Sequence, residues 1–152
     1  MSASSVIQGL FFNRIRSYEV QSDAILLPIS LDGSSSEDIS FSLKTMYPNI
    51  SEKIIRTTLS GRLGVGSILV HDSTKPLILI APFKAKRTDP YSSEYVDAFI
   101  TKLESISDKI GIKSLSVEFS SLAPTDEICN HFKSNKIKLN LFFNKLGEKN
   151  NV

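Results

Sequence analysis

The chain has 152 residues, of which 41% are hydrophobic and 22% are charged, and its formal net charge is +2. This length and balance favour a single globular domain with enough apolar residues for one core. The small net charge excludes the general signature of a nucleic-acid-binding protein, so no nucleic-acid partner is expected, although a local basic patch stays open.

The sequence also argues against disulfides, secretion and membrane insertion. Cys129 is the single cysteine, so no internal disulfide can form. The first residues, MSASSVIQGLFF, lack the basic stretch and long apolar run of a signal peptide. No apolar run approaches the roughly 20 residues that span a bilayer. We therefore expect a cytoplasmic protein, in the host cytoplasm if the chain is viral, with no membrane partner.

The first half of the chain alternates predicted strands and helices. Residues 6–7 lie in a short strand candidate, and residues 23–29 (DAILLPI) form a continuous apolar run typical of a central strand. Residues 38–46 predict a helix that ends before a proline. A second helix is predicted to follow a Ser51 cap, with an apolar face of Ile54, Ile55 and Leu59.

The second half contains the most regular helix of the chain. Strand candidates at 67–71 and 77–81 precede it. Its cap is Ser92 or Ser93, and Gly111 stops it. Apolar residues recur along it at helical spacing: Val96, Phe99, Ile100, Leu103, Ile106 and Ile110. Further along the chain come a strand at 114–119, a short helix at 125–133 and a strand at 137–143.

This alternation predicts an α/β fold of three layers, with a mixed, mainly parallel central sheet and helices on both faces. We assign residues 1–146 to a single domain and residues 147–152 to a polar tail expected to fray. Ligands of such folds bind at the carboxyl ends of the central strands. The loops after Ile29 and Phe119 are therefore the candidate ligand loops.

Several segments carry a family resemblance through their order along the chain. They are DAILLPIS (23–30), GSSSEDISFSLKTMYP (33–48), SGRLGVGSILV (60–70), LILIAPFKAK (77–86), KIGIKSLSV (109–117) and IKLNLFF (137–143). In this order they resemble the macro domain family, whose members bind ADP-ribose and often remove it from proteins or DNA. The pattern is most similar to the branch that includes DNA ADP-ribosyl glycohydrolases. The resemblance implies a macro-domain-like fold from about residue 9 to residue 143.

The resemblance also implies a ligand site built from two loops and the closing strand. Its expected ligand-binding residues are Ser30, Gly33, Ser34, Ser35, Ser36, Asp38, Ser120, Ser121 and Phe143. The serine run 34–36 is either a remodelled ligand loop or a plain turn, and Phe143 either stacks on the ligand or packs in the core.

The chain departs from the family pattern where the ligand would bind. Leu27 and Ser30 stand where the family has asparagines, and Leu10 replaces an acidic adenine contact. Gly33 is the one glycine left in the first loop, and residues 120–124 (SSLAP) replace a glycine-rich second loop. Glycine lets backbone N–H groups approach a diphosphate closely, and proline removes a donor. Weak or altered nucleotide binding without standard hydrolysis, as in a pseudoenzyme, is expected.

Three functions are compatible with the sequence. The first is a degenerate binding domain for an ADP-ribose-related or other nucleotide-derived ligand, or for a host protein, since small macro-like proteins occur in phages and other viruses. The second is an active ADP-ribosyl hydrolase in which Asp32, Asp38 or Glu118 acts as general acid or base. The third is a structural or assembly subunit. No cofactor is expected in any of them.

The remaining reactive residues favour structural roles. His71 and His131 belong to no cluster with metal-ligand spacing, so no metal site is expected. Cys129 and His131 are two residues apart on a predicted helix and face different directions. A basic loop of Lys84, Lys86 and Arg87 is predicted to be solvated, with contact to a phosphate or a partner as the alternative.

Overall fold

The computed structural model describes residues 10–13, 21–35, 38–119, 130–132 and 139–145. In chain order its elements are β1 (Leu10–Asn13), β2 (Ala24–Ser30), α1 (Asp38–Met46), α2 (Asn49–Leu59), β3 (Leu69–His71), β4 (Leu77–Lys84), α3 (Ser93–Ile110), β5 (Ser114–Phe119) and β6 (Asn140–Lys145).

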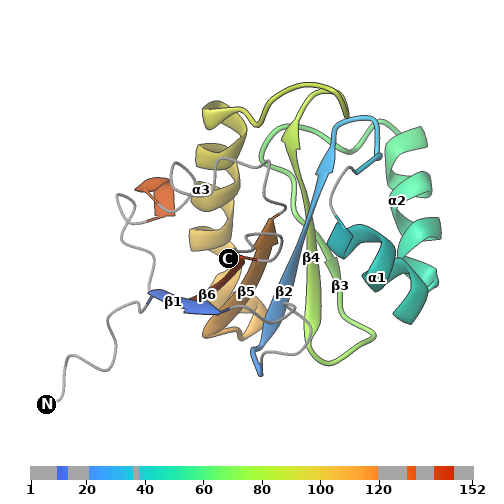
Figure 1. The fold of residues 1–152 in the computed structure, drawn as a ribbon. Helices are drawn as coiled ribbons and strands as arrows, with labels where there is room; N and C mark the ends of the chain where they lie inside the picture. The colour runs from blue at the N-terminus through green and yellow to red at the C-terminus, as the bar shows by residue number, and fades with distance from the viewer. Residues whose placement is uncertain (1–9, 14–20, 36–37, 120–129, 133–138, 146–152) are drawn as a thin grey trace, which may run out of the picture.

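The described strands form one sheet of six in the order β1-β6-β5-β2-β4-β3. β3 pairs with β4 in antiparallel fashion, and all other neighbours are parallel. In Figure 1, α3 covers one face of this sheet while α1 and α2 cover the other. The predicted three-layer α/β fold with a mixed, mainly parallel sheet is therefore confirmed.

β2 is buried along its whole length because it contributes to both halves of the core. Ala24 and Leu26 pack in the cluster that includes α3. Ile25, Leu27 and Ile29 pack on the other side, with the apolar residues of α1 and α2. Alternate residues of a strand point to opposite faces, so a continuous apolar run satisfies both helical layers.

The long helix α3 forms where the sequence predicts, with Ser92 in the N-cap position but without a side-chain hydrogen bond there. Val96, Phe99, Ile100 and Leu103 are buried against the sheet. Gly111 ends the helix in a left-handed conformation (φ 75°), which glycine adopts without a Cβ penalty. Its backbone N–H donates to the carbonyls of Ser107 and Asp108 at 3.0 and 3.2 Å.

Two expectations for α2 are wrong. The helix begins at Asn49, with Pro48 in the N-cap position and no side-chain cap, so Ser51 is not the cap. Ile55 and Leu59 do not face the core, because their exposed fractions are 58% and 84%. Ile50 and Ile54, four residues apart, form the buried stripe instead. Ile55 and Leu59 lie about 140° and 180° away from Ile50 around the helix.

Other boundaries also differ from the expectations. β3 is shorter than residues 67–71, and β6 extends past the predicted end at 143. β4 continues beyond residue 81, through Pro82 to Lys84. The pairing of β2 with β4 is irregular at this point, since Ile29 pairs with Pro82 but Ser30 pairs with Lys84. Proline has no N–H to donate to the ladder, which accounts for an irregularity beside it. The strand candidate at 6–7 and most of the predicted helix at 125–133 lie outside the described residues, but 130–132 are helical.

No helix within the described ranges is long and apolar enough to cross a bilayer.

Replacing Leu103 with alanine should lower the free energy of unfolding by about 2–5 kcal/mol, because the side chain is fully buried and its loss leaves a cavity. The matched control is Leu59→Ala, which removes the same atoms from an 84% exposed position. It should change stability by no more than about 0.5 kcal/mol. Chemical denaturation measures both, and equal losses would contradict the described packing of α3.

Candidate functional site

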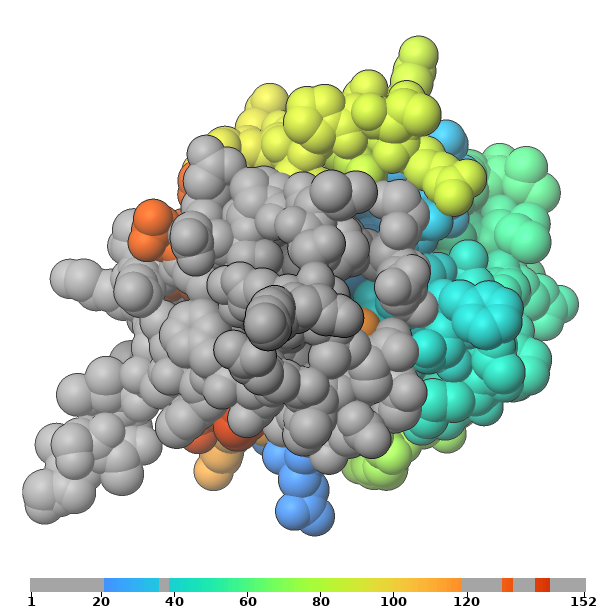
Figure 2. Space-filling model, in the orientation of Figure 1, coloured from blue at the N-terminus to red at the C-terminus, as the bar shows by residue number. Residues whose placement is uncertain are grey.

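The parallel strands β2, β4 and β5 end at the same edge of the sheet, at the top of Figure 1. Three polar residues near these ends are buried: Ser30 on β2, Lys84 on β4 and Glu118 on β5. The backbone N–H of Leu31 donates to the carbonyl of Lys84 at 2.9 Å, which ties the first two strand ends together. In the same orientation, Figure 2 shows the loop after β4 (yellow-green) running along this upper edge. This edge is the candidate functional site.

The loop after β2 uses much of its own hydrogen-bonding capacity. The backbone N–H of Ser30 donates to the Ser34 carbonyl at 2.7 Å, and that of Gly33 donates to the Ser30 carbonyl at 2.9 Å. The N–H of Ser34 donates to Asp32 Oδ1 at 3.0 Å. Together with the Leu31 N–H, four backbone donors of this loop are engaged within the protein. A diphosphate bound here would have to compete for them.

The hydroxyls of the serine run are engaged as well. Ser34 Oγ donates to Asp32 Oδ1 at 2.6 Å, and Ser35 Oγ donates to the Pro28 carbonyl at 2.9 Å. These bonds hold the loop in place and occupy the hydroxyl protons. The hydroxyl and N–H of Ser34 also lower the pKa of the Asp32 carboxyl below its ordinary value. Asp32 therefore stays ionised near neutral pH, where it adds negative charge to the loop.

Gly33 fixes the path of this loop over α2. Its φ is 90°, a left-handed value that side chains rarely adopt. A Cβ at this position would lie 2.9 Å from Thr58 Oγ1 and 3.3 Å from Ile54 Cγ2. Both the backbone conformation and the close approach to α2 thus require glycine.

Ser30 differs from its neighbours because its hydroxyl has no partner. The residue is fully buried, and Ser30 Oγ forms no hydrogen bond with the rest of the described structure. Leaving a buried hydroxyl without a partner costs about 1–3 kcal/mol. Such a group at the end of a central strand is a candidate contact for a bound molecule.

The structure brings together part of the predicted site. Ser30 is the last residue of β2, and Gly33, Ser34 and Ser35 lie in the loop that follows it. Asp38 is the first residue of α1, and Phe143 pairs in register with Val117 of β5. Ser36, Ser120 and Ser121 lie outside the described residues, so the second predicted loop stays a prediction.

The expectation that Lys84 lies in a solvated loop is wrong. Lys84 is the last residue of β4 and only 8% exposed. Its Nζ lies 5.1 Å from the centre of the Tyr91 ring, within range of a cation–π contact. Lys86 and Arg87 are exposed, as expected. The apolar run that extends β4 through Phe83 is the signal in the sequence that Lys84 belongs to the strand.

The two histidines each contact a neighbouring polar side chain. His71 Nε2 lies 3.1 Å from Ser73 Oγ, and burial lowers the pKa of His71 below its ordinary value. His131 Nδ1 lies 2.6 Å from Asp97 Oδ1 on α3. Within the described ranges, no group of three or more His, Cys, Asp or Glu side chains is arranged to hold a metal ion. Cys129 lies outside these ranges.

Solved structures share this architecture. The macrodomain of Thermus aquaticus DarG has a TM-score of 0.77 and 16% identity, over 89% of this chain and 97% of that one. Thermosipho africanus DarTG in complex with ADP-ribose has a TM-score of 0.78 and 12% identity, over 97% of this chain and 44% of that one. The Trypanosoma brucei macrodomain in complex with ADP-ribose has a TM-score of 0.62 and 10% identity, over 96% and 67%. No protein-family model and no curated protein matches the sequence. At these identities the similarity shows a common fold.

Changing Gly33 to alanine should destabilise the protein by about 1–3 kcal/mol through backbone strain, and further through the 2.9 Å contact with Thr58. Gly61→Ala is the control, since Gly61 has a similar φ of 73° but no atom within 4 Å of the place that a Cβ would take. Denaturant unfolding should therefore show a larger loss for Gly33→Ala. Equal losses would mean that the approach to α2 does not constrain the loop.

Proposed function

We propose that this chain, whose fold is that of a macrodomain, binds an ADP-ribose-related or other nucleotide-derived ligand at the carboxyl edge of its sheet, without standard hydrolysis. The observation that carries the proposal is the fully buried Ser30 hydroxyl, which has no hydrogen-bond partner in the described structure. A ligand hydroxyl or phosphate oxygen would supply that partner. Two proteins of the same fold, from Thermosipho africanus and Trypanosoma brucei, were solved in complex with ADP-ribose. The proposed location is the cytoplasm.

The hydrogen bonds within the first loop support weak binding. A diphosphate is held best by free backbone N–H groups, and four of this loop already donate within the protein. The ionised Asp32 opposes a phosphate nearby, although the exposed Lys86 offsets part of its charge. Each lost contact to a charged phosphate removes about 1.5–3 kcal/mol. We expect a Kd for ADP-ribose of about 1 mM, where a glycine-rich loop would give micromolar binding.

The same residues argue against ordinary glycohydrolase chemistry. Leu27 stands where the family has one asparagine, and it is fully buried among the apolar residues of α1 and α2. Ser30 replaces the other asparagine with a shorter side chain that has no amide. Asp32 is ionised, so it cannot donate a proton as a general acid near neutral pH. Binding without turnover is the function that these residues support best.

Removing the Ser30 hydroxyl tests the ligand site directly. Ser30→Ala should raise the free energy of unfolding by about 1 kcal/mol, because a buried unsatisfied group is lost, yet weaken ADP-ribose binding by about fivefold. The control is Ser22→Ala, just before the other end of β2, where the hydroxyl donates to the Ala24 carbonyl at 2.9 Å. It should lower stability and leave affinity unchanged. Titration by NMR and denaturation measure both, and unchanged affinity in Ser30→Ala would refute this site.

A turnover assay distinguishes the proposed binding function from the alternative of an active hydrolase. Hydrolysis of ADP-ribosylated protein and of ADP-ribosylated DNA should be undetectable at enzyme concentrations that saturate a control macrodomain reaction. Asp38→Ala and Glu118→Gln test the remaining candidate acids, and Asp32→Ala tests the ionised carboxylate as a general base. Turnover that any one of these changes abolishes would establish the hydrolase.

Absence of both binding and turnover would redirect the proposal to a host-protein surface at the same loops. Ser35→Glu and Lys86→Glu should then reduce capture of that partner. A symmetric oligomer in solution, with no ligand, would support the assembly alternative.

A further inference from the structure

A cleft lies at the edge of the sheet opposite to β1, where β3 is the last strand. The cleft has a volume of about 410 Å³ and opens between α2, the loop from residue 60 to residue 68, β3 and α3. We call it the edge cleft. None of its lining residues belongs to the candidate ligand site.

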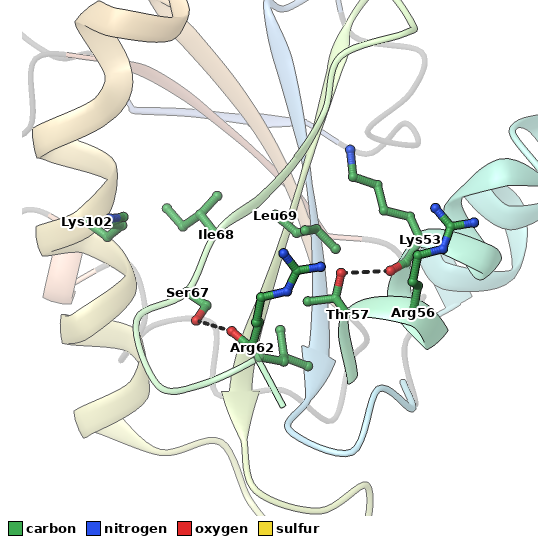
Figure 3. Close-up of a pocket in the computed structure, with 9 residues that line it drawn as sticks. Lys53, Arg56, Thr57, Arg62, Ser67, Ile68, Leu69 and Lys102 are labelled. Atoms are coloured by element: carbon green, nitrogen blue, oxygen red, sulfur yellow. Dashed lines mark hydrogen bonds between the residues drawn. The ribbon is translucent and has the colours of Figure 1, made fainter. Parts of the chain in front are cut away.

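The charges of the edge cleft have one sign. Lys53 and Arg56 come from α2, Arg62 from the following loop and Lys102 from α3, and no acidic residue of the described ranges lines the cleft. Figure 3 shows these side chains coming from both sides of the sheet edge, with Lys102 on α3 across from the α2 residues. Four cations thus gather on a protein whose formal net charge is only +2.

Most of these charges are not neutralised by neighbouring acids. Arg56 pairs with Glu52 at 2.9 Å, on an exposed face of α2. Lys53, Arg62 and Lys102 form no ion pair within the described part of the chain. Clustered like charges repel, and a concave surface lined by one sign of charge concentrates its field on a counter-ion. The arrangement favours an anionic ligand.

Hydrogen bonds to uncharged groups engage only some of the N–H donors of these four cations. Lys53 Nζ donates to the Val70 carbonyl at 2.7 Å, and Arg62 Nε donates to Ser60 Oγ at 3.0 Å. The second bond uses only Nε of Arg62. The two terminal nitrogens of its guanidinium can therefore bind the paired oxygens of a phosphate. Lys102 is exposed on α3 at the rim of the cleft, so its ammonium can reach an anion there without desolvation of a buried charge.

The rest of the lining narrows the ligand class. Thr57 and Ser67 add hydroxyls, and Leu63, Ile68 and Leu69 add apolar surface. Among the residues that the structure describes, no aromatic side chain lines the cleft, so they offer no stacking platform for a base. Because the cations come from three elements, they suit a ligand with several linked anionic groups better than a ligand with a single anionic group.

We infer that the edge cleft binds linked phosphate groups, of a nucleic-acid backbone or of a free polyphosphate, separately from the ADP-ribose-related site. The inference does not depend on the proposed function, because it uses other residues. The local basic patch, and not the net charge of the chain, carries the affinity.

The test compares two phosphate-bearing probes on matched variants. Tripolyphosphate and a 12-residue oligothymidylate are each titrated into the wild-type protein, Arg62→Ala/Lys102→Ala, and Lys109→Ala/Lys113→Ala. Both pairs remove two exposed positive charges, but only the first pair lies in the edge cleft. The first should weaken binding by about tenfold and the second by less than about twofold. For the oligothymidylate, the slope of log K against log salt concentration should fall by about 1.4 in magnitude, for two lost phosphate contacts.

The outcomes distinguish the two possible sources of the linked phosphates. Binding of both probes supports recognition of linked phosphates in general, binding of the oligothymidylate alone assigns a nucleic-acid backbone, and binding of tripolyphosphate alone assigns a free polyphosphate. No binding of either probe, or equal losses in the two double variants, overturns the inference. Thermal unfolding checks that both variants fold, and ADP-ribose affinity should not change in Arg62→Ala/Lys102→Ala. The experiment can therefore refute the proposal for the edge cleft without refuting the proposal for the ADP-ribose-related site, and the reverse.

Discussion

The burial of β2 on both of its faces is the constraint from which the rest of this structure follows. The strand has parallel neighbours on each side and a helical layer above and below it. Because every residue of Ala24–Ser30 is buried, a polar side chain on this strand costs free energy unless it has a hydrogen-bond partner. Ser30 is the last residue of the strand, and its unsatisfied hydroxyl marks the boundary between the core and the candidate site.

The loop that follows β2 is held in place by contacts within the protein. In a phosphate-binding loop, glycines leave backbone donors free and let the chain pass close to the ligand. Here Gly33 is needed for close approach to α2, a demand of packing. Ser34 and Ser35, which follow Gly33, hold the loop through bonds to Asp32 and Pro28. The loop is thus stabilised by donors that a bound phosphate would compete for.

The fold could be predicted from the sequence further than the site could. The helical spacing of its apolar residues and a stop at Gly111 predicted α3, and the predicted helix at 38–46 and strand at 114–119 have the bounds of α1 and β5. The predicted buried face of α2 was wrong, because Ile55 and Leu59 are apolar but lie on the exposed side of the helix. The macro-domain-like fold, predicted from the order of the segments, agrees with the structures that share it.

The candidate site was only partly predictable, because its properties depend on pairing between distant segments. The buried position of Lys84 depends on how far β4 continues beside β2. The unsatisfied Ser30 hydroxyl and the internal bonds of Ser34 are matters of geometry that residue types do not specify. The edge cleft is lined by residues between Lys53 and Leu69 and by Lys102, and no sequence motif predicts that they lie together.

The contact between Lys53 and the Val70 carbonyl has a consequence for self-association. An edge strand presents unpaired backbone groups that can template another chain. β3 is only three residues long, and the Lys53 ammonium occupies the carbonyl at its centre. An incoming strand would have to displace a charged group and bury it. Without this lysine the Val70 carbonyl would be open to pairing with a strand of another molecule, so the Lys53 side chain, besides lining the cleft, opposes pairing at this edge.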